Sequence, residues 1–456
     1  MKRILFFGLL LFACSNANAQ LPQIQITAVF PAGAQQGSSV DVAITAGSNM
    51  DEAAELVFSH PGLSATAKLD AKGEPIANQF VVSVSADTQP GLYDVRLKGL
   101  FGISNPRIFR VDTLPEIQEA EPNNTPAQAQ TVAINSIVNA RSNGAADVDV
   151  FHINVAANQS IAIRSEAAIL DSVMQPTLEL FDAAGRRVAQ ARRITQHDAV
   201  IVYENPIDQT LSLKVHDVVY AGSSDYTYRL SIDTRPVVDF VVPPVVQSAV
   251  DSQVTVFGRN MADAVPTDLT IDGVPLQKKQ ITLKVADTNH GSVGTDSAST
   301  SINAVTYSGI DGNLLSLSVQ NLPVSFVTES SEQSAFQTIE VPTTVSGTFA
   351  KELDEDTYRF TAKKGEQWQI EVLAQRLNSS ADPILVVEQV LTAADGTETL
   401  KRLAREDDNK QNPGGAILPT LTSDPSFVLN VPEDGQYQVR IKDKFSASRG
   451  AANLTY

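Results

Sequence analysis

Five oxygen-bearing residues, in two short segments, have the types and the spacing that could hold a metal ion. Glu119, Glu121 and Asn123 alternate along the first segment, and Asp147 and Asp149 repeat the two-residue spacing in the second. Alternate residues of an extended chain point to the same side, so each segment can present its oxygen atoms together. Ca²⁺ takes six to eight oxygen ligands of these kinds. The pattern therefore predicts a calcium site, with calcium as the cofactor.

The first of these segments also has an interpretation without an ion. Pro122 fixes the backbone after Glu121, and Asn123 and Asn124 are residues that often close turns. On this interpretation, residues 119–124 form a rigid, solvated linker. The residues alone leave both interpretations open.

Residue patterns typical of hydrolases do not occur in the sequence. A Gly-x-Ser-x-Gly turn and a glycine-rich phosphate loop are both missing. The acidic run at residues 406–408 is interpreted as a solvated turn or a cation site. No histidine stands at metal-ligand spacing from another among the five: His60, His152, His197, His216 and His290. We therefore expect a protein that is not an enzyme.

The segments that carry these residues alternate apolar and polar side chains with a period of two. Examples are residues 40–44, 151–155, 211–215 and 437–441. This period is typical of strands with one buried face. Turn signals such as Pro90-Gly91 separate the segments at short intervals, which favours β-sandwiches over βαβ units. The predicted fold class is all-β, with tandem β-sandwiches in which Ig-like and jelly-roll-like domains alternate.

The strand pattern also predicts the surroundings of individual residues. Alternation places His152 and His216 at solvent-facing positions. Trp368 is predicted to pack in a core. The polar stretch at residues 288–301 is predicted to be a loop between strands of the second Ig-like domain.

Two sequence landmarks recur with nearly the same shift. Residues 42–50 resemble residues 254–261, about 212 positions later, and residues 147–151 resemble residues 354–358, 207 positions later. Two different landmarks shifted by similar amounts indicate that a two-domain unit was duplicated.

The repeat predicts five regions in the chain. They are a signal peptide at 1–19, an Ig-like domain at 20–113, a jelly-roll domain at 114–233, a second Ig-like domain at 234–326, and a second jelly-roll domain at 327–456. We expect residues 20–233 and 234–456 to form separable units, because Arg235-Pro236 has the character of a linker.

The first domain of each unit resembles the IPT/TIG class of Ig-like domains. The resemblance rests on a Pro/Gly-rich start and on a strand that ends in Gly-x-Asn and an apolar residue. These features lie at residues 31–33 and 47–50, and again at residues 243–244 and 258–261. Gly and Asn at this place are expected to form a tight bend.

The second domain of each unit resembles the bacterial pre-peptidase C-terminal domain. The matching segments of the earlier copy are residues 119–125, 147–151, 178–185, 216–217 and 226–230. The later copy lacks the Glu-Pro-Asn-Asn start, for which residues 329–337 offer no equivalent. It also stops at Tyr456, so we expect its last strand to be cut short and the chain to be the front part of a longer protein.

This resemblance implies a jelly-roll-like sandwich that accompanies secreted proteases or surface proteins and binds a polymer or a protein partner. In the related collagen-binding modules of clostridial collagenases, residues matching the Glu and Asn positions of 119–123 and the aspartates of 147–149 ligate calcium. The resemblance thus implies the same calcium site that the spacing predicts.

The N-terminus has the features of an export signal. Lys2 and Arg3 precede a short apolar run, and Ala17-Asn18-Ala19 predicts cleavage before Gln20. A rival interpretation takes residues 11–14 as a lipobox and Cys14, the only cysteine, as a lipid anchor. No later segment is long and apolar enough to span a membrane. We expect an exported protein, whether extracellular, periplasmic or on the cell surface.

The net charge of −18 makes nucleic acid an unsuitable partner, because an acidic surface repels phosphates. The predicted function is a non-catalytic binding or adhesion protein whose partner is an extracellular polymer or protein. Two alternatives remain: a structural spacer, and the non-catalytic part of a larger secreted protease.

Overall fold

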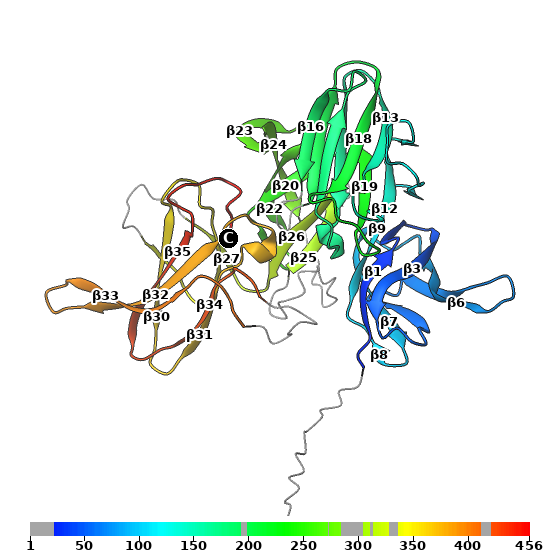
Figure 1. Cartoon of the computed structure of the whole chain (residues 1–456). Coiled ribbons are helices and arrows are strands. Elements are labelled where there is room, and N and C mark those ends of the chain that lie inside the picture. The colour runs from blue at the N-terminus through cyan, green and yellow to red at the C-terminus, as the bar shows by residue number, and fades with distance from the viewer. Residues whose placement is uncertain are drawn as a thin grey trace, which may run out of the picture.

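The computed structural model describes residues 22–192, 198–271, 273–283, 304–310, 313–327, 336–411 and 421–456. Their regular structure consists of β-strands and two single-turn 3-10 helices, η1 (Ala168–Leu170) and η2 (Gln375–Leu377). The predicted all-β fold of tandem sandwiches is therefore confirmed (Figure 1). Within the described residues, no helix is long and apolar enough to cross a bilayer. The expected signal peptide, Cys14 and the loop at 288–301 lie outside them.

The first Ig-like domain contains two sheets around one core. One sheet has the order β1 (Gln25–Phe30), β3 (Ser39–Ser48), β6 (Pro75–Val84) and β5 (Leu63–Leu69). The other has the order β2 (Gly33–Gln35), β9 (Arg107–Asp112), β7 (Gly91–Gly99) and β4 (Glu55–Phe58), with β8 (Gly102–Ile103) beside β7. Phe80 from one sheet and Phe109 from the other are both buried in this core, as the alternation of the strands requires.

The next ten strands, β10 to β19, form the first sandwich from two five-stranded sheets. One has the order β10 (Glu116–Gln118), β12 (Ser136–Arg141), β19 (Thr227–Asp233), β14 (Gln159–Glu166) and β17 (Ala199–Asn205). The facing sheet has the order β11 (Gln130–Val132), β13 (Asp149–Val155), β18 (Gln209–Asp217), β15 (Pro176–Phe181) and β16 (Arg187–Arg192). Leu211, Leu213 and Val215 show the expected period of two, since all three are fully buried.

The second Ig-like domain repeats part of the strand order of the first. One sheet has the order β20 (Val237–Val242), β22 (Ser252–Arg259), β24 (Val274–Leu283) and β23 (Val265–Ile271). The other has the order β21 (Val245–Gln247), β26 (Asn313–Gln320) and β25 (Ala304–Ile310).

The second sandwich consists of strands β27 to β35. Five of them form a sheet in the order β28 (Gln337–Thr338), β30 (Glu355–Ala362), β35 (Gly435–Asp443), β32 (Pro383–Thr392) and β33 (Glu398–Glu406). The rest form two separate pairs, β27 (Val324–Phe326) with β29 (Thr344–Ser346), and β31 (Gln367–Glu371) with β34 (Ser426–Asn430). Because β27 pairs with β29, this sandwich begins before the expected boundary between residues 326 and 327.

The Gly-x-Asn motif has two separate physical causes in the structure. Asn49 and Asn260 adopt positive φ angles of 52° and 56°, which Asn tolerates. Gly47 and Gly258 are needed for close packing instead. A Cβ atom on Gly258 would lie 2.1 Å from the carbonyl oxygen of Val237, and one on Gly47 would lie 2.4 Å from that of Gln25. The bend was predicted correctly, but only its Asn requires the left-handed backbone.

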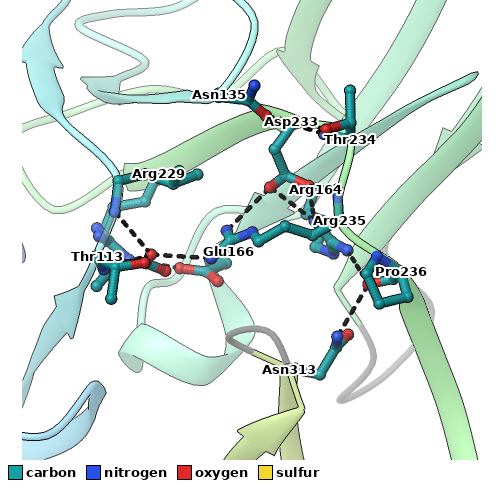
Figure 2. Close-up of polar contacts among 12 residues, drawn as sticks. Thr113, Asn135, Arg164, Glu166, Arg229, Asp233, Thr234, Arg235, Pro236 and Asn313 are labelled. Carbon is teal, nitrogen blue, oxygen red and sulfur yellow. Dashed lines mark hydrogen bonds and ion pairs between the residues drawn. The ribbon is translucent and has the colours of Figure 1, made fainter. Parts of the chain in front are cut away.

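A buried network of charges joins the first Ig-like domain to the first sandwich (Figure 2). Arg229 on β19 is 1% exposed and pairs with Glu116 and, at 2.7 Å, with Glu166. Arg110 on β9 reaches the other oxygen of Glu166 at 2.5 Å. Although burial opposes it, the guanidinium groups of Arg110, Arg235 and Arg229 lower the pKa of Asp112 to about 2.

The Arg235-Pro236 segment belongs to the same network and is not a free linker (Figure 2). Arg235 pairs at 2.9 Å with Asp112 of the first Ig-like domain and with Asp233 of the first sandwich. The Pro236 carbonyl oxygen accepts hydrogen bonds from Arg164 at 2.6 Å and from Asn313 of the second Ig-like domain at 2.9 Å. Three domains therefore meet at residues 233–236. The linker character expected for Arg235-Pro236 did not take these partners into account.

Loss of Arg229 should destabilise this junction strongly. Replacing it with Met removes the cation that pairs with the buried carboxylates of Glu116 and Glu166. Breaking a buried ion pair in this way lowers the free energy of unfolding by about 3–5 kcal/mol. The exposed Arg187 on β16, paired with Glu179, is the matched control, and Arg187→Met should cost at most about 1 kcal/mol. Urea unfolding followed by circular dichroism measures both variants. Equally small losses of unfolding free energy in the two variants would contradict the stabilising role of the network.

Candidate functional site

The predicted site residues lie where one segment crosses from one sheet of the first sandwich to the other. Glu119 follows β10, which pairs with β12, and the segment then leads to β11, which pairs with β13 in the facing sheet. Two backbone bonds hold this crossing. The Glu119 amide donates to the Asn139 carbonyl at 3.0 Å, and the Val150 amide donates to the Asn123 carbonyl at 2.9 Å. The crossing thus brings the acidic segment against the start of β13.

Three carboxylates converge at this point. Glu119, Glu121 and Asp149 each offer an oxygen, and these atoms all lie within 4.8 Å of one another. Glu119 Oε1 accepts a hydrogen bond from the Arg141 amide at 2.8 Å. Its Oε2 is buried and accepts no hydrogen bond from any residue that the structure describes. A buried carboxylate oxygen without a donor is costly, so a proton or a cation at this oxygen would stabilise the fold.

Asn123 is fully buried and faces two of these carboxylates. With its amide nitrogen toward them, it donates to Asp149 Oδ1 at 3.2 Å and to Glu121 Oε2 at 3.0 Å. With its amide oxygen there instead, four residues direct oxygen atoms to one place, which is the arrangement that a cation requires. The two orientations of Asn123 thus differ in whether its side chain donates to the carboxylates or adds a further oxygen to them.

Asp147 lies beside this group but is engaged elsewhere. One of its oxygens accepts from the Asn143 amide at 2.6 Å, and the other accepts from Asn124 at 3.2 Å. The structure thus brings together Glu119, Glu121, Asn123 and Asp149. Asp147 adds negative charge close by and shapes the Asn143 turn.

Two residues of this site were not identified from the sequence. Tyr228 on β19 donates its hydroxyl to Asp149 Oδ2 at 2.5 Å, and Asn143 donates its side-chain amide to Glu121 Oε1 at 2.8 Å. The sequence signal for Tyr228 was its place on an alternating strand, which marks only a core position. Asn143 had no signal beyond a turn.

The electrostatics of the site oppose full ionisation of its carboxyl groups. Burial, followed by the charges of Asp149, Glu121 and Asp147, raises the pKa of the Glu119 carboxyl. Burial and the charges of Asp147 and Glu121 likewise raise the pKa of Asp149, although the Tyr228 hydroxyl opposes this. Each raised pKa means that the folded protein destabilises the ionised form of that carboxyl group. Either protons or a metal ion must offset the charge.

The second sandwich provides an internal comparison. Asp356 takes the place of Asp149 and accepts a hydrogen bond from the Tyr456 hydroxyl at 2.5 Å, as Asp149 does from Tyr228. The Val327 amide donates to Ser346 as the Glu119 amide donates to Asn139. An apolar Val327 therefore occupies the position of Glu119. Within the described residues, the only such carboxylate group is that of the first sandwich.

His216 does not face solvent as predicted. It lies on the outward side of β18, but Tyr220 stacks on it with ring centroids 4.3 Å apart. Glu179 approaches its Nε2 at 3.9 Å, so the ring is buried. Alternation gave the correct face of the strand and missed the side chains that cover it. His152 is half-buried, and Trp368 is half-buried against the core of the second sandwich.

The raised pKa values predict an unusual pH dependence in calcium-free buffer. A carboxyl whose folded pKa exceeds its unfolded value, about 4, stabilises the fold below that value and loses this contribution as pH rises through the folded pKa. The first sandwich should therefore lose roughly 1.4 kcal/mol of stability for each pH unit between the unfolded and the folded pKa of Glu119. Glu119→Gln should flatten this slope, measured as thermal midpoints against pH. Glu204→Gln, at an exposed position on β17, should keep it. Identical slopes in wild type and Glu119→Gln would count against the buried acidic group.

Comparisons with known proteins give only distant likenesses. The sequence matches no known protein family and no curated protein. A pre-peptidase C-terminal domain of a collagenase from Bacillus anthracis is 22% identical, with 24% of this chain and 99% of that chain covered and a TM-score of 0.19. The SGBP-B protein of a mixed-linkage glucan utilisation locus of Bacteroides ovatus is 11% identical, covers 93% and 74%, and has a TM-score of 0.17. A carbohydrate-binding module of the β-sandwich superfamily is 11% identical, covers 47% and 98%, and has a TM-score of 0.15. At these values, the likenesses do not indicate what this chain binds.

Proposed function

We propose that this chain is an exported, non-catalytic binding protein whose first sandwich is stabilised by a calcium ion, and that its partner is an extracellular polymer or protein. The observation that carries the proposal is the convergence of Glu119, Glu121 and Asp149 around a buried oxygen that lacks a donor. The predicted signal peptide and the net charge of −18 support an exported protein that attracts cations.

An ion at this place would hold the two sheets together. Glu119 follows β10 of one sheet, and Asp149 begins β13 of the other. The residues that would bind it are Glu119, Glu121, Asn123 and Asp149. Water can complete the six to eight ligands that Ca²⁺ prefers, whereas Mg²⁺ demands a tighter octahedron and gives up its water reluctantly. Calcium is therefore the ion that this group of residues suits best.

The proposal includes two tandem units, each made of an Ig-like domain and a pre-peptidase-like sandwich, of which only the first binds calcium. Val327 supports the difference between them, because a valine cannot replace the carboxylate of Glu119. A structural spacer is the second candidate function. The charge network at residues 233–236 favours it, since a spacer needs domains that keep their orientation.

Calcium should raise the thermal stability of the full chain. Binding adds about 2.7 kcal/mol at a hundredfold excess over the dissociation constant. Melting in calcium and in chelator measures the effect, and magnesium should give a smaller rise than calcium. Equal melting midpoints in calcium and in chelator would show that the chain has no such calcium site.

Variants of the site test which residues are responsible. Glu119→Val copies the residue of the second sandwich, so it should fold in chelator and lose the response to calcium. Asp149→Asn should lose the response as well, whereas the exposed Glu204→Gln should respond as the wild type does. A full response in Glu119→Val would show that calcium acts elsewhere.

The binding function predicts that the protein is retained on insoluble material. The full chain should co-sediment with at least one member of a panel of insoluble polysaccharides, fibrous proteins and bacterial cell walls, and calcium should increase the bound fraction. The Glu119→Val variant is the control for the calcium effect. Retention on none of these materials would favour the spacer.

A further inference from the structure

Asn143, beside the acidic group of the first sandwich, is the only asparagine in the sequence that precedes a glycine. It lies with Gly144 between β12 and β13. In an Asn-Gly pair, the backbone nitrogen of the glycine can attack the side-chain amide carbon of the asparagine. The glycine has no Cβ atom to obstruct this approach, and its backbone is free to adopt the conformation that the attack requires.

Both reacting groups are accessible in the structure. Asn143 is exposed, and the Gly144 amide donates to no residue among those that the structure describes. A Cβ atom on Gly144 would have open space around it. The chain just before the glycine is anchored instead, because the Asn143 amide donates to Asp147 at 2.6 Å and the Ser142 amide donates to the Tyr226 carbonyl at 2.9 Å. The attacking nitrogen is therefore free next to a fixed backbone.

The side-chain amide of Asn143 is held from both sides. Arg141 Nε donates to its Oδ1 at 2.8 Å, and its Nδ2 donates to Glu121 Oε1 at 2.8 Å. Attack on the amide carbon moves negative charge onto Oδ1. A guanidinium that already donates to this oxygen is placed to stabilise that charge.

We propose that Asn143 is a site of spontaneous deamidation, promoted by Arg141, whose product adds a carboxylate to the acidic group of Glu119, Glu121 and Asp149. A bond forms between the Gly144 nitrogen and Cγ of Asn143, and the bond from Cγ to Nδ2 breaks. The proton of the Gly144 amide leaves with Nδ2 as ammonia, and a cyclic imide remains. Water then opens the imide to aspartate or isoaspartate, so the net change is the gain of water and the loss of ammonia.

The product changes the contact with Glu121. Asn143 now donates a hydrogen bond to Glu121, but a carboxylate in its place has no proton to donate and carries the same charge. Oxygens of Glu121, Glu119 and Asp149 already lie within 4.8 Å of one another. The conversion therefore adds repulsion to the group and increases its need for a cation.

Peptide mapping by mass spectrometry tests the reaction on the full chain, incubated in warm, mildly alkaline buffer. The peptide that contains Asn143 should gain the mass difference between aspartate and asparagine, and part of it should elute as isoaspartate. Asn158 is the internal control, because it is exposed but precedes Gln159, whose amide donates to Ala156 at 3.3 Å. An unchanged Asn143, or equal conversion of Asn158, would overturn the proposal.

Two variants test the roles of the neighbours. Gly144→Ala has room for its methyl group and should slow the conversion roughly tenfold, because a Cβ atom restricts the approach of the nitrogen. Arg141→Met removes the donor to Oδ1 and should slow the conversion in the folded protein but not in urea, where the contact is absent. Equal rates of folded wild type and folded Arg141→Met would overturn the role of Arg141.

Asn143→Asp tests the consequence for the acidic group. Its melting midpoint in chelator should lie below that of the wild type, because Glu121 loses a donor and gains a like charge. Calcium should raise the midpoint of this variant more than that of the wild type, an expectation that rests on the proposed calcium site. The absence of any calcium response in both proteins would count against that site and leave the deamidation measured by mass intact. Equal midpoints of the two proteins in chelator would overturn the proposed effect on the acidic group.

Discussion

Neutralisation of buried charge is the constraint on which the rest of this structure depends. A charged group inside a sandwich is tolerated only with a partner of opposite sign. At the domain junction, Arg229 meets this need between Glu116 and Glu166. In the same sandwich, Glu119 beyond the end of β10 lies close to Asp149 at the start of β13 in the facing sheet, and no cation among the described residues pairs with them. The sandwich thus contains one group of buried charges that the chain neutralises itself and one acidic group for which we propose an ion.

The two sandwiches meet this constraint in different ways. The second sandwich replaces acidic residues of the first with Val324, Val327 and Leu373. Its described residues therefore form neither the pairs that match those of Arg229 nor a group of converging carboxylates. Substitution of a few acidic side chains on a shared strand order therefore decides whether a buried acidic group forms.

Alternation in the sequence was sufficient to predict the strands and the fold class, because a strand with one buried face has a period of two. The spacing of Glu119, Glu121 and Asp149 predicted one site, and the structure brings an oxygen of each within 4.8 Å of the others. It could not indicate that Asp147 would be held by Asn143, since that contact depends on how a turn closes. Contacts such as those of Tyr228 and Arg235 join residues from separate strands or domains, and local patterns carry no information about them. For the same reason, the covering of His216 by Tyr220 was missed.

The bonded segment at residues 233–236 has a consequence for recognition at longer range. Because Arg235 and Pro236 contact three domains, these bonds restrain the separation between surfaces on the first sandwich and on the second Ig-like domain. Two weak contacts on such a rigid body reinforce each other only when the spacing of the target matches that separation. A polymer whose repeat matches that separation would then bind with higher affinity, because both contacts form at once, whereas an irregular polymer would form only one contact at a time.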